Sequence, residues 1–300
     1  MFNKTATAAY ILACVLALPA WAGEVHLRHG GLELNANLEP APGGSINDGP
    51  VILMAHGTMG HNGMETISTL QKLFGENGIS SLAINLSLSE SARHGMYPCE
   101  NLQRHRHEDA VGEIFAWVEW LKARGVKDIY LFGHSRGASQ VALVAGKLTS
   151  GAVKGAILLA PITWESKTVH ENYLARRGKP LEPLLAHAQA LISSGKPEAV
   201  LEKTGFLHCA ETNVTAGSFV SYYGGGVEQD TPSLLSRVNT PVLVIAGSND
   251  DVVGDLVERV KPHTGGGKIK LVIVDGADHF FRDIFAYDVA DAVKSFTTGK

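Results

Sequence analysis

Short runs of aliphatic and β-branched residues recur along the chain, and most of them are continuously apolar instead of alternating with polar positions. A strand that is buried on both faces of a sheet needs this pattern. An earlier segment, Glu24–Leu38, does alternate and predicts two antiparallel strands at an edge of the sheet. The predicted core strands are Val51–His56, Ile79–Asn85, Asp128–Gly133, Gly155–Ala160, Pro241–Gly247 and Ile269–Val274.

Segments with helical periodicity separate these runs. Regular alternation of strand and helix predicts an α/β fold, with a mostly parallel central sheet flanked by helices on both faces. The predicted helices are Glu65–Asn77, Glu108–Arg124, Ser135–Thr149, Asp251–Lys261 and Arg282–Ser295.

One long segment interrupts the alternation. Between Ile162 and about Asn239 no strong apolar strand is predicted, and prolines interrupt the segment. Two parts of it, Leu181–Ser193 and Pro197–Thr204, have a helical pattern. Because the strand pattern resumes afterwards, we predict an insertion or lid of about residues 162–239 over one end of the sheet, and not a second domain. Such segments often shape substrate pockets.

The first 22 residues have the features of a signal peptide. Lys4 supplies a positive charge, Ala6–Leu18 is an uncharged apolar stretch, and Ala20-Trp21-Ala22 fits a cleavage site of the A-x-A type. We therefore predict that the mature chain begins at Gly23 and is exported, to the periplasm or out of the cell. A membrane anchor, or a lipoprotein modified at Cys14, is the alternative, although the apolar stretch is shorter than the ~20 residues of a membrane span.

The composition and the spacing of the histidines argue against a nucleic-acid-binding protein and against a metal site. The 300 residues carry 26 lysines and arginines against 30 acidic residues, and no basic patch interleaved with aromatic residues points to nucleic acid. The 13 histidines show no metal-binding spacing, and we expect neither a metal nor an organic cofactor. Cys99 and Cys209 would remain after the leader is removed. In an oxidising compartment they either pair or stay separate thiols.

A candidate nucleophile lies at one strand-to-helix junction. Gly133-His134-Ser135-Arg136-Gly137 fits the pattern G-x-S-x-G, with a predicted strand directly before it and a helical run directly after it. A turn this tight forces its central residue into a strained backbone conformation and lifts its hydroxyl above the sheet edge. The two glycines leave room for the strand and the helix to approach closely. The helix N-terminus beneath Ser135 favours developing negative charge.

With this elbow, the chain resembles the α/β-hydrolase superfamily, and more loosely its esterase, dienelactone-hydrolase and prolyl-oligopeptidase-like branches. The resemblance extends from about Val51 to the C-terminus. It implies the α/β-hydrolase fold for the mature chain, residues 23–300, and triad partners that follow in the order Ser, acid, His.

The resemblance also implies individual site residues. His279, in Asp275-Gly276-Ala277-Asp278-His279, follows the last predicted strand, where the family places its base. Gly247-Ser248-Asn249-Asp250-Asp251 resembles the family's acid turn and selects Asp250, with Asp251 as the alternative. In His56-Gly57-Thr58-Met59-Gly60, the backbone N–H of Thr58, or else that of Met59, corresponds to one oxyanion donor. The N–H of Arg136 corresponds to the other.

These motifs indicate a serine hydrolase that cleaves an acyl bond, a carboxylic ester before other acyl bonds, through an acyl-enzyme on Ser135. Aminopeptidase-like, thioesterase or acyltransferase activity on the same triad is one alternative, and a non-catalytic binding protein of the same fold is another. The expected partner is a small-molecule acyl substrate. We expect no nucleic acid and no stable membrane insertion after signal removal, and the oligomeric state stays open.

Loops that follow parallel strands surround the ligand crevice of open α/β sheets. Arg93, His94, Tyr97 and Trp164 lie in such loops and are candidates for the pocket. The stretch His105–Glu108 lacks the spacing of a metal-binding helix and is expected to be a solvated helix start.

Overall fold

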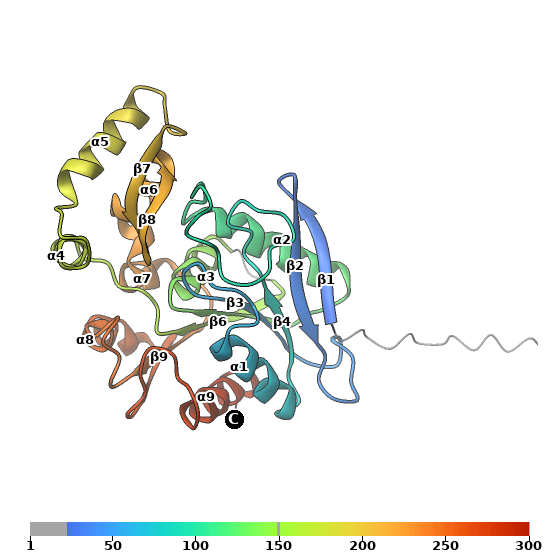
Figure 1. Cartoon of the computed structure of the whole chain (residues 1–300). Coiled ribbons are helices and arrows are strands. Elements are labelled where there is room, and N and C mark those ends of the chain that lie inside the picture. The colour runs from blue at the N-terminus through green and yellow to red at the C-terminus, as the bar shows by residue number, and fades with distance from the viewer. Residues whose placement is uncertain (1–22, 149–150, 300) are drawn as a thin grey trace, which may run out of the picture.

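The computed structural model of the chain describes residues 23–148 and 151–299 (Figure 1). Its central feature is a sheet with the strand order β1-β2-β4-β3-β5-β6-β9-β10. The predicted leader, residues 1–22, lies outside the described residues. The strands are β1 (Gly23–His29), β2 (Leu32–Glu39), β3 (Val51–Ala55), β4 (Ser80–Ile84), β5 (Ile129–His134), β6 (Val153–Leu159), β9 (Val242–Gly247) and β10 (Ile269–Val274).

The sheet is mostly parallel. Strand β3 pairs in parallel with β4 and β5, and the parallel pairing continues through β6 and β9 to β10. Strands β1 and β2 form the antiparallel edge. Every residue of β3, β4 and β9 is buried, which explains why these strands are continuously apolar or small in sequence. The predicted fold class, the α/β-hydrolase fold, is confirmed.

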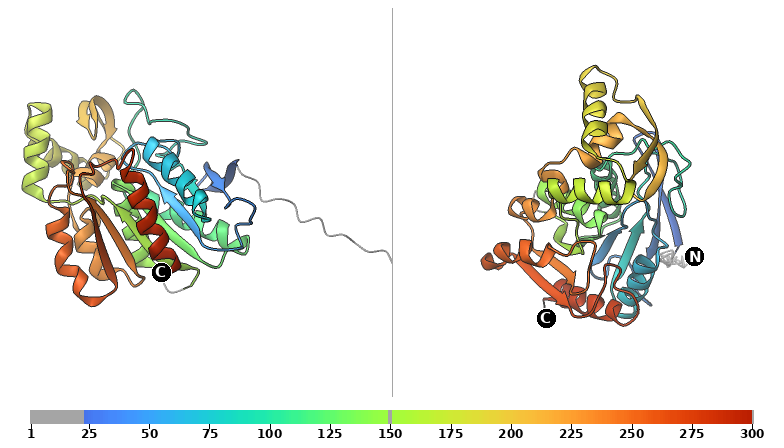
Figure 2. Two further views of the ribbon diagram at one scale, coloured as in Figure 1. Left: turned by 90° about the horizontal axis from the view of Figure 1, so that it is seen from below. Right: turned by 60° about the vertical axis from the view of Figure 1, so that its left-hand side comes forward.

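Helices cover both faces of the sheet (Figures 1 and 2). Helices α1 and α9 pack against each other, and α2 packs against α3. The ring of Phe74 in α1 meets that of Phe132 in β5 edge to face, with 6.0 Å between centroids. Among the described residues, no helix is both long and apolar enough to cross a membrane. The bounds are α1 (Glu65–Glu76), α2 (Asp109–Ala123), α3 (Arg136–Lys147), α8 (Leu256–Val260) and α9 (Phe285–Thr298).

The segment between β6 and β9, which we call the insertion, lies above one end of the sheet (Figure 1). It has a small apolar core of its own, which includes Phe206, Phe219 and Tyr222. Its elements are α4 (Ser166–Arg177), α5 (Glu182–Ser193), β7 (Val200–Phe206), β8 (Cys209–Thr215) and α6 (Ala216–Tyr223), followed by short helical turns that include α7 (Thr231–Leu234).

The helix predicted over Pro197–Thr204 is wrong, because Val200–Thr204 belongs to strand β7. Strands β7 and β8 form an antiparallel hairpin in a sheet of their own. Leu201 and Phe206 of β7 point into the core of the insertion. Hairpin pairing and packing into this small core stabilise the strand more than the local pattern of Pro197–Thr204 favours a helix.

A disulfide fixes the insertion to the main sheet. Cys99, in the loop between β4 and α2, is bonded to Cys209 at the start of β8, with 5.5 Å between their Cα atoms. Beside it, the N–H of Gln103 donates to the carbonyl of Asn213, and the N–H of Thr215 donates to the carbonyl of Gln103. The loop after β4 and the hairpin are therefore joined both covalently and through their backbones.

Removing this disulfide should destabilise the protein. The disulfide closes a loop with a sequence separation of 110 residues. Without it, the unfolded chain gains conformational entropy. We therefore expect Cys99→Ala/Cys209→Ala to lower the free energy of unfolding by about 2–5 kcal/mol. Urea titration followed by tryptophan fluorescence measures this loss. Reductant should lower the unfolding midpoint of the wild type and leave that of the double variant unchanged. Equal midpoints for both proteins without reductant would show that the disulfide contributes no stability.

Candidate active site

The strand-to-helix turn at Ser135 has a strained backbone. Ser135 lies between the end of β5 and the start of α3 with φ 55° and ψ −122°, a region that residues other than glycine rarely occupy. A Cβ atom on Gly133 would lie 2.4 Å from the backbone of Gly137, and one on Gly137 would lie 2.3 Å from the carbonyl oxygen of His56. Glycine is therefore required at both positions if strand and helix are to meet at this turn.

Three side chains that are far apart in the sequence meet here. Oγ of Ser135 lies 2.9 Å from Nε2 of His279, and Nδ1 of His279 lies 2.8 Å from Oδ2 of Asp250. All three residues are buried. They follow β5, β10 and β9, which are parallel and so end at the same edge of the sheet. In this arrangement a proton can pass from the hydroxyl to the imidazole while the carboxylate holds the opposite ring nitrogen.

The surroundings of Asp250 keep it ionised. Its Oδ1 accepts hydrogen bonds from the backbone N–H groups of Val252 (2.8 Å) and Val253 (3.0 Å). Burial by itself raises the pKa of Asp250, but the hydrogen bond and charge of His279, together with the two N–H groups, outweigh burial and hold the pKa below its usual value. Asp251, the alternative acid, is exposed and lies outside this set of hydrogen bonds.

The turn after Asp250 also shortens the following helix. A helix was predicted over Asp251–Lys261, but α8 begins only at Leu256. The side chain of Asp250 binds the two N–H groups that a helix starting at Asp251 would have to satisfy in another way. The chain therefore makes a turn first.

The loop His56–Gly60, which we call the HG loop, faces Ser135. Gly57 and Thr58 line the cavity beside Ser135, as does Arg136. Met59 is buried outside the cavity lining in a left-handed conformation (φ 52°), and its carbonyl accepts the N–H of Tyr97. Within the described residues, neither the backbone N–H of Thr58 nor that of Met59 forms a backbone hydrogen bond, so the two differ only in that Thr58 lines the cavity. The geometry thus favours Thr58 over Met59 as the donor that faces the cavity.

A buried histidine and a buried arginine brace the HG loop. Nδ1 of His56 donates to the carbonyl of Gly57 (2.8 Å), and its Nε2 accepts the N–H of Leu86 (3.1 Å). Burial and the nearby charge of Arg93 lower the pKa of His56 to about 3, so the ring is neutral. Nη2 of Arg93 donates to the carbonyl of Gly60 (2.7 Å). Arg93 therefore lies behind the loop, and its prediction as a pocket residue is wrong.

A second histidine, inside the elbow itself, was missed by the sequence analysis. His134 is buried, and its Nε2 donates to the carbonyl of His279 (2.9 Å). Burial and the neighbouring ring of His279 lower the pKa of His134 to about 4. Its neutral ring therefore ties the loop that carries His279 to β5. The G-x-S-x-G pattern leaves this position free, so the pattern contains no signal for the contact.

Two further histidines are buried where solvated residues were expected. His105 and His107 are 1% and 2% exposed, so the prediction of a solvated helix start over His105–Glu108 is wrong for them. Nδ1 of His105 lies 2.8 Å from the hydroxyl of Tyr222 in the insertion. Burial lowers the pKa of both rings to about 3. The start of α2 is covered by the insertion, and no local pattern of the chain reveals that.

A cavity of about 430 Å³ opens beside Ser135 and His279. The insertion supplies much of its wall, including Trp164, Tyr222 and Tyr223. Of the predicted pocket residues Trp164 lines the cavity, whereas Arg93, His94 and Tyr97 are not part of the lining. The Trp164 ring packs against Gly225, where a Cβ atom would lie 2.4 Å from the ring. Gly225 therefore makes room for the indole.

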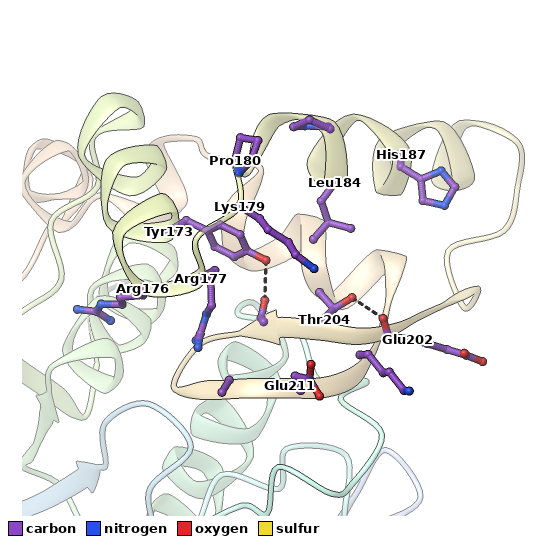
Figure 3. A pocket seen from close by; sticks show the side chains of 14 residues that line it. Tyr173, Arg176, Arg177, Lys179, Pro180, Leu184, His187, Glu202, Thr204 and Glu211 are labelled. Atoms are coloured by element: carbon purple, nitrogen blue, oxygen red, sulfur yellow. Dashed lines mark hydrogen bonds between the residues drawn. The ribbon is translucent and has the colours of Figure 1, made fainter.

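A larger cavity, of about 850 Å³, lies within the insertion (Figure 3). It is formed between α4, α5 and the β7–β8 hairpin, and its lining contains none of the three residues that meet at the elbow. Lys179 reaches into it, whereas Arg176 points to the opposite side, away from Lys179 and His187 (Figure 3). Arg176 lines both cavities. Size alone therefore does not identify the site, and it is the smaller cavity that Ser135 and His279 line.

One group of possible metal ligands occurs in the described part of the chain. Cys99, His208 and Cys209 come close enough to share an ion. The two sulfurs are bonded to each other, however, so neither is available as a thiolate ligand.

The chain is similar to known hydrolases in sequence and in fold. Residues 52–293 match the model of the Alpha/beta hydrolase family. Est1E from Butyrivibrio proteoclasticus is 23% identical, with a TM-score of 0.64 over 93% of this chain and 98% of that chain. The monoacylglycerol lipase of Paleococcus ferrophilus is 16% identical, with a TM-score of 0.62 over 89% and 99%. GrgF, an alpha/beta hydrolase from Penicillium sp. sh18, is 18% identical, with a TM-score of 0.64 over 94% and 100%.

At these identities the solved structures show a common fold and leave the substrate open. A comparison with curated proteins gave no significant match.

The buried histidines should make the protein sensitive to mild acid. In the folded state the pKa values of His56, His105 and His107 fall to about 3 and that of His134 to about 4, against an ordinary value near 6.5. Their contribution to stability is complete above pH 6.5. It falls by about 1.4 kcal/mol per histidine for each pH unit below that, because only the unfolded state takes up the protons.

Urea titrations at pH 7, 6 and 5 measure this dependence. His107→Gln should reduce the slope of the free energy of unfolding against pH by the equivalent of about one proton. His187→Gln, a change at an exposed position of α5, should leave this slope as in the wild type. A midpoint that stays constant from pH 7 to pH 5 would contradict the neutral state of these rings.

Proposed function

The chain belongs to the alpha/beta hydrolase family, and on that premise we propose that it is a serine hydrolase that cleaves carboxylic esters through an acyl-enzyme on Ser135. One observation carries the proposal: the two hydrogen bonds that join Ser135 to His279 and His279 to Asp250 at the wall of a cavity. A serine hydroxyl needs such a base to become a nucleophile near neutral pH.

The proposed reaction has two halves. Nε2 of His279 takes the Oγ proton of Ser135 as Oγ attacks the carbonyl carbon, and the developing oxyanion is bound by the backbone N–H groups of Thr58 and Arg136. The tetrahedral intermediate then collapses, His279 returns the proton to the leaving alcohol, and the acyl group stays on Ser135. Water, activated by His279, releases the acid in the second half. Asp250 holds the ring orientation and stabilises the imidazolium in both halves.

Esters are preferred to amides or thioesters for two reasons. Two of the similar structures are named as an esterase and as a monoacylglycerol lipase. Residues 23–148 and 151–299 form the main sheet, its helices and the insertion, and none of these described residues belongs to a peptidase propeller. The partner is therefore a small-molecule acyl substrate.

We also propose that the mature chain is exported. The N-terminal residues have a positive charge, an apolar stretch and an A-x-A site, which together fit a signal peptide. The disulfide between Cys99 and Cys209 supports this, since disulfides persist mainly in oxidising compartments.

Covalent labelling tests the nucleophile directly. A fluorophosphonate probe should modify the wild type at Ser135, as mapped by mass spectrometry, and should not label folded Ser135→Ala. Asp250→Asn should lower kcat for 4-nitrophenyl acetate by about 10³- to 10⁴-fold, because the histidine then adopts the wrong tautomer. The adjacent exposed variant Asp251→Asn is the matched control and should change kcat by about twofold at most. A folded wild-type protein that the probe does not label would exclude this function.

A panel of acyl compounds tests the bond. The panel contains an ester, a thioester and an aminoacyl amide with a common acyl group. We expect the ester to have the highest kcat/KM of the three. Product analysis with added alcohols separates hydrolysis from acyl transfer. Cleavage of the amide alone would replace the esterase proposal with an aminopeptidase.

N-terminal sequencing of the protein recovered after export tests the leader. We expect the mature chain to start at Gly23. An intact N-terminus, or a lipid-modified Cys14, would contradict simple export.

A further inference from the structure

The residue after the nucleophile is a cation without a carboxylate partner. The guanidinium of Arg136 lies 4.9 Å from the centroid of the Tyr222 ring, and its Nε donates a hydrogen bond of 3.2 Å to Oγ1 of Thr58. Within the described part of the chain, no Asp or Glu forms an ion pair with it, and its two terminal nitrogens donate to no acceptor. Arg136 is only partly buried and lines the cavity. Those donors are therefore open to a ligand.

The lining of the cavity as a whole has an excess of positive charge. Its lining contains Arg136 and Arg176 and, among the described residues, no Asp or Glu. Arg176 is exposed on α4 and forms no ion pair with a described residue. The chain as a whole carries a formal net charge of −4, so the cavity is opposite in sign to the protein around it. A partly desolvated site with one sign of charge concentrates ligands of the other sign.

Neutral groups hold the guanidinium in position. Nε2 of His105 donates to Oε1 of Gln103 (3.1 Å), because the amide nitrogen of Gln103 is already bound to backbone carbonyls. Nδ1 of His105 then accepts the hydroxyl of Tyr222 (2.8 Å), which fixes the ring beside Arg136. A cation–π contact orients a guanidinium without neutralising it, as a carboxylate would. Burial lowers the pKa of Arg136, but an arginine side chain still keeps its proton.

We propose that this cavity selects an ester that carries a free carboxylate, which Arg136 binds and Arg176 attracts at the cavity mouth. The proposal rests on the hydrolase function proposed above for Ser135. The planar fork of a guanidinium matches the two oxygens of a carboxylate. The partly buried cation of Arg136 balances one negative charge, whereas the second charge of a dianionic phosphate would be left to the exposed Arg176.

The rest of the lining suits the body of such a substrate. Trp164, Val252 and Phe280 supply apolar surface around the cavity, which would contact an aliphatic chain or an aromatic ring between the carboxylate and the ester. Arg136 is hydrogen-bonded to Thr58 in the HG loop. In the substrate, the carboxylate would therefore be separated from the reacting carbonyl by only a few covalent bonds.

Two matched pairs of substrates test the proposal. The first is mono-4-nitrophenyl adipate and its methyl ester, in which the carboxylate is on the acyl half. The second is 4-acetoxybenzoate and its methyl ester, in which the carboxylate is on the leaving group. For each pair the measured quantity is the ratio of kcat/KM for the acid to kcat/KM for the methyl ester. This ratio cancels any loss that affects both members equally.

The wild type should prefer the acid in at least one pair. Arg136→Met should reduce that ratio by about 10- to 100-fold, Arg136→Lys should retain part of it, and Arg176→Gln should reduce it by a smaller factor because its charge is exposed. Lys179→Gln removes a cation from the larger cavity of the insertion and is the matched control, with an unchanged ratio. Circular dichroism verifies that each variant is folded.

The outcomes separate this proposal from the one it rests on. If the fluorophosphonate probe labels Ser135 and the wild type favours the methyl ester in both pairs, or Arg136→Met leaves the ratio unchanged, the carboxylate proposal is wrong and the hydrolase stands. If Ser135 is not labelled, calorimetric titration of Ser135→Ala with adipate monomethyl ester and with dimethyl adipate still decides the matter. Tighter binding of the monoanion, lost in Ser135→Ala/Arg136→Met, supports the proposal, and equal binding of both compounds overturns it.

Discussion

Strand β5 and helix α3 approach each other so closely at residues 133–137 that no side chain fits at either end of the turn. A Cβ atom on Gly137 would overlap the carbonyl oxygen of His56, and one on Gly133 would overlap the backbone of Gly137. This contact forces Ser135 into its strained backbone conformation with positive φ and directs its hydroxyl to His279. It also brings the HG loop against Ser135, so the positions of His279 and of the N–H groups of the HG loop relative to Ser135 depend on the same close packing.

Neutral imidazole rings support this site from behind. His56 holds the HG loop, His134 holds the loop of His279, and His105 holds Tyr222. Each ring donates or accepts hydrogen bonds in a place where burial disfavours its charged form. The site is therefore positioned by neutral rings together with the buried cation of Arg93 and the carboxylate of Asp250, and Arg136 supplies a cation without a carboxylate partner to the cavity itself.

The insertion turns the sheet edge into a cavity. Trp164 and the tyrosines of α6 close one side of the space above Ser135. The disulfide and the hydrogen bonds of Gln103 fix the hairpin to the loop after β4. The same segment also contains the larger second cavity, which adjoins the site through Arg176. The shape and charge of the space that a substrate would enter thus come largely from a part of the chain outside the alternation of strand and helix.

The sequence by itself determined the α/β order, the elbow and the neighbourhoods of His279 and Asp250, because continuous apolar runs and the G-x-S-x-G turn are local patterns that few other structures satisfy. Local patterns do not record which distant groups meet. The tertiary structure alone decided that Asp250 and not Asp251 faces His279, that Cys99 pairs with Cys209, that Pro197–Thr204 enters a hairpin, and that Arg93 lies behind the HG loop. Each of these depends on burial and on partners that are tens to hundreds of residues away, where the free energy of packing outweighs local preference.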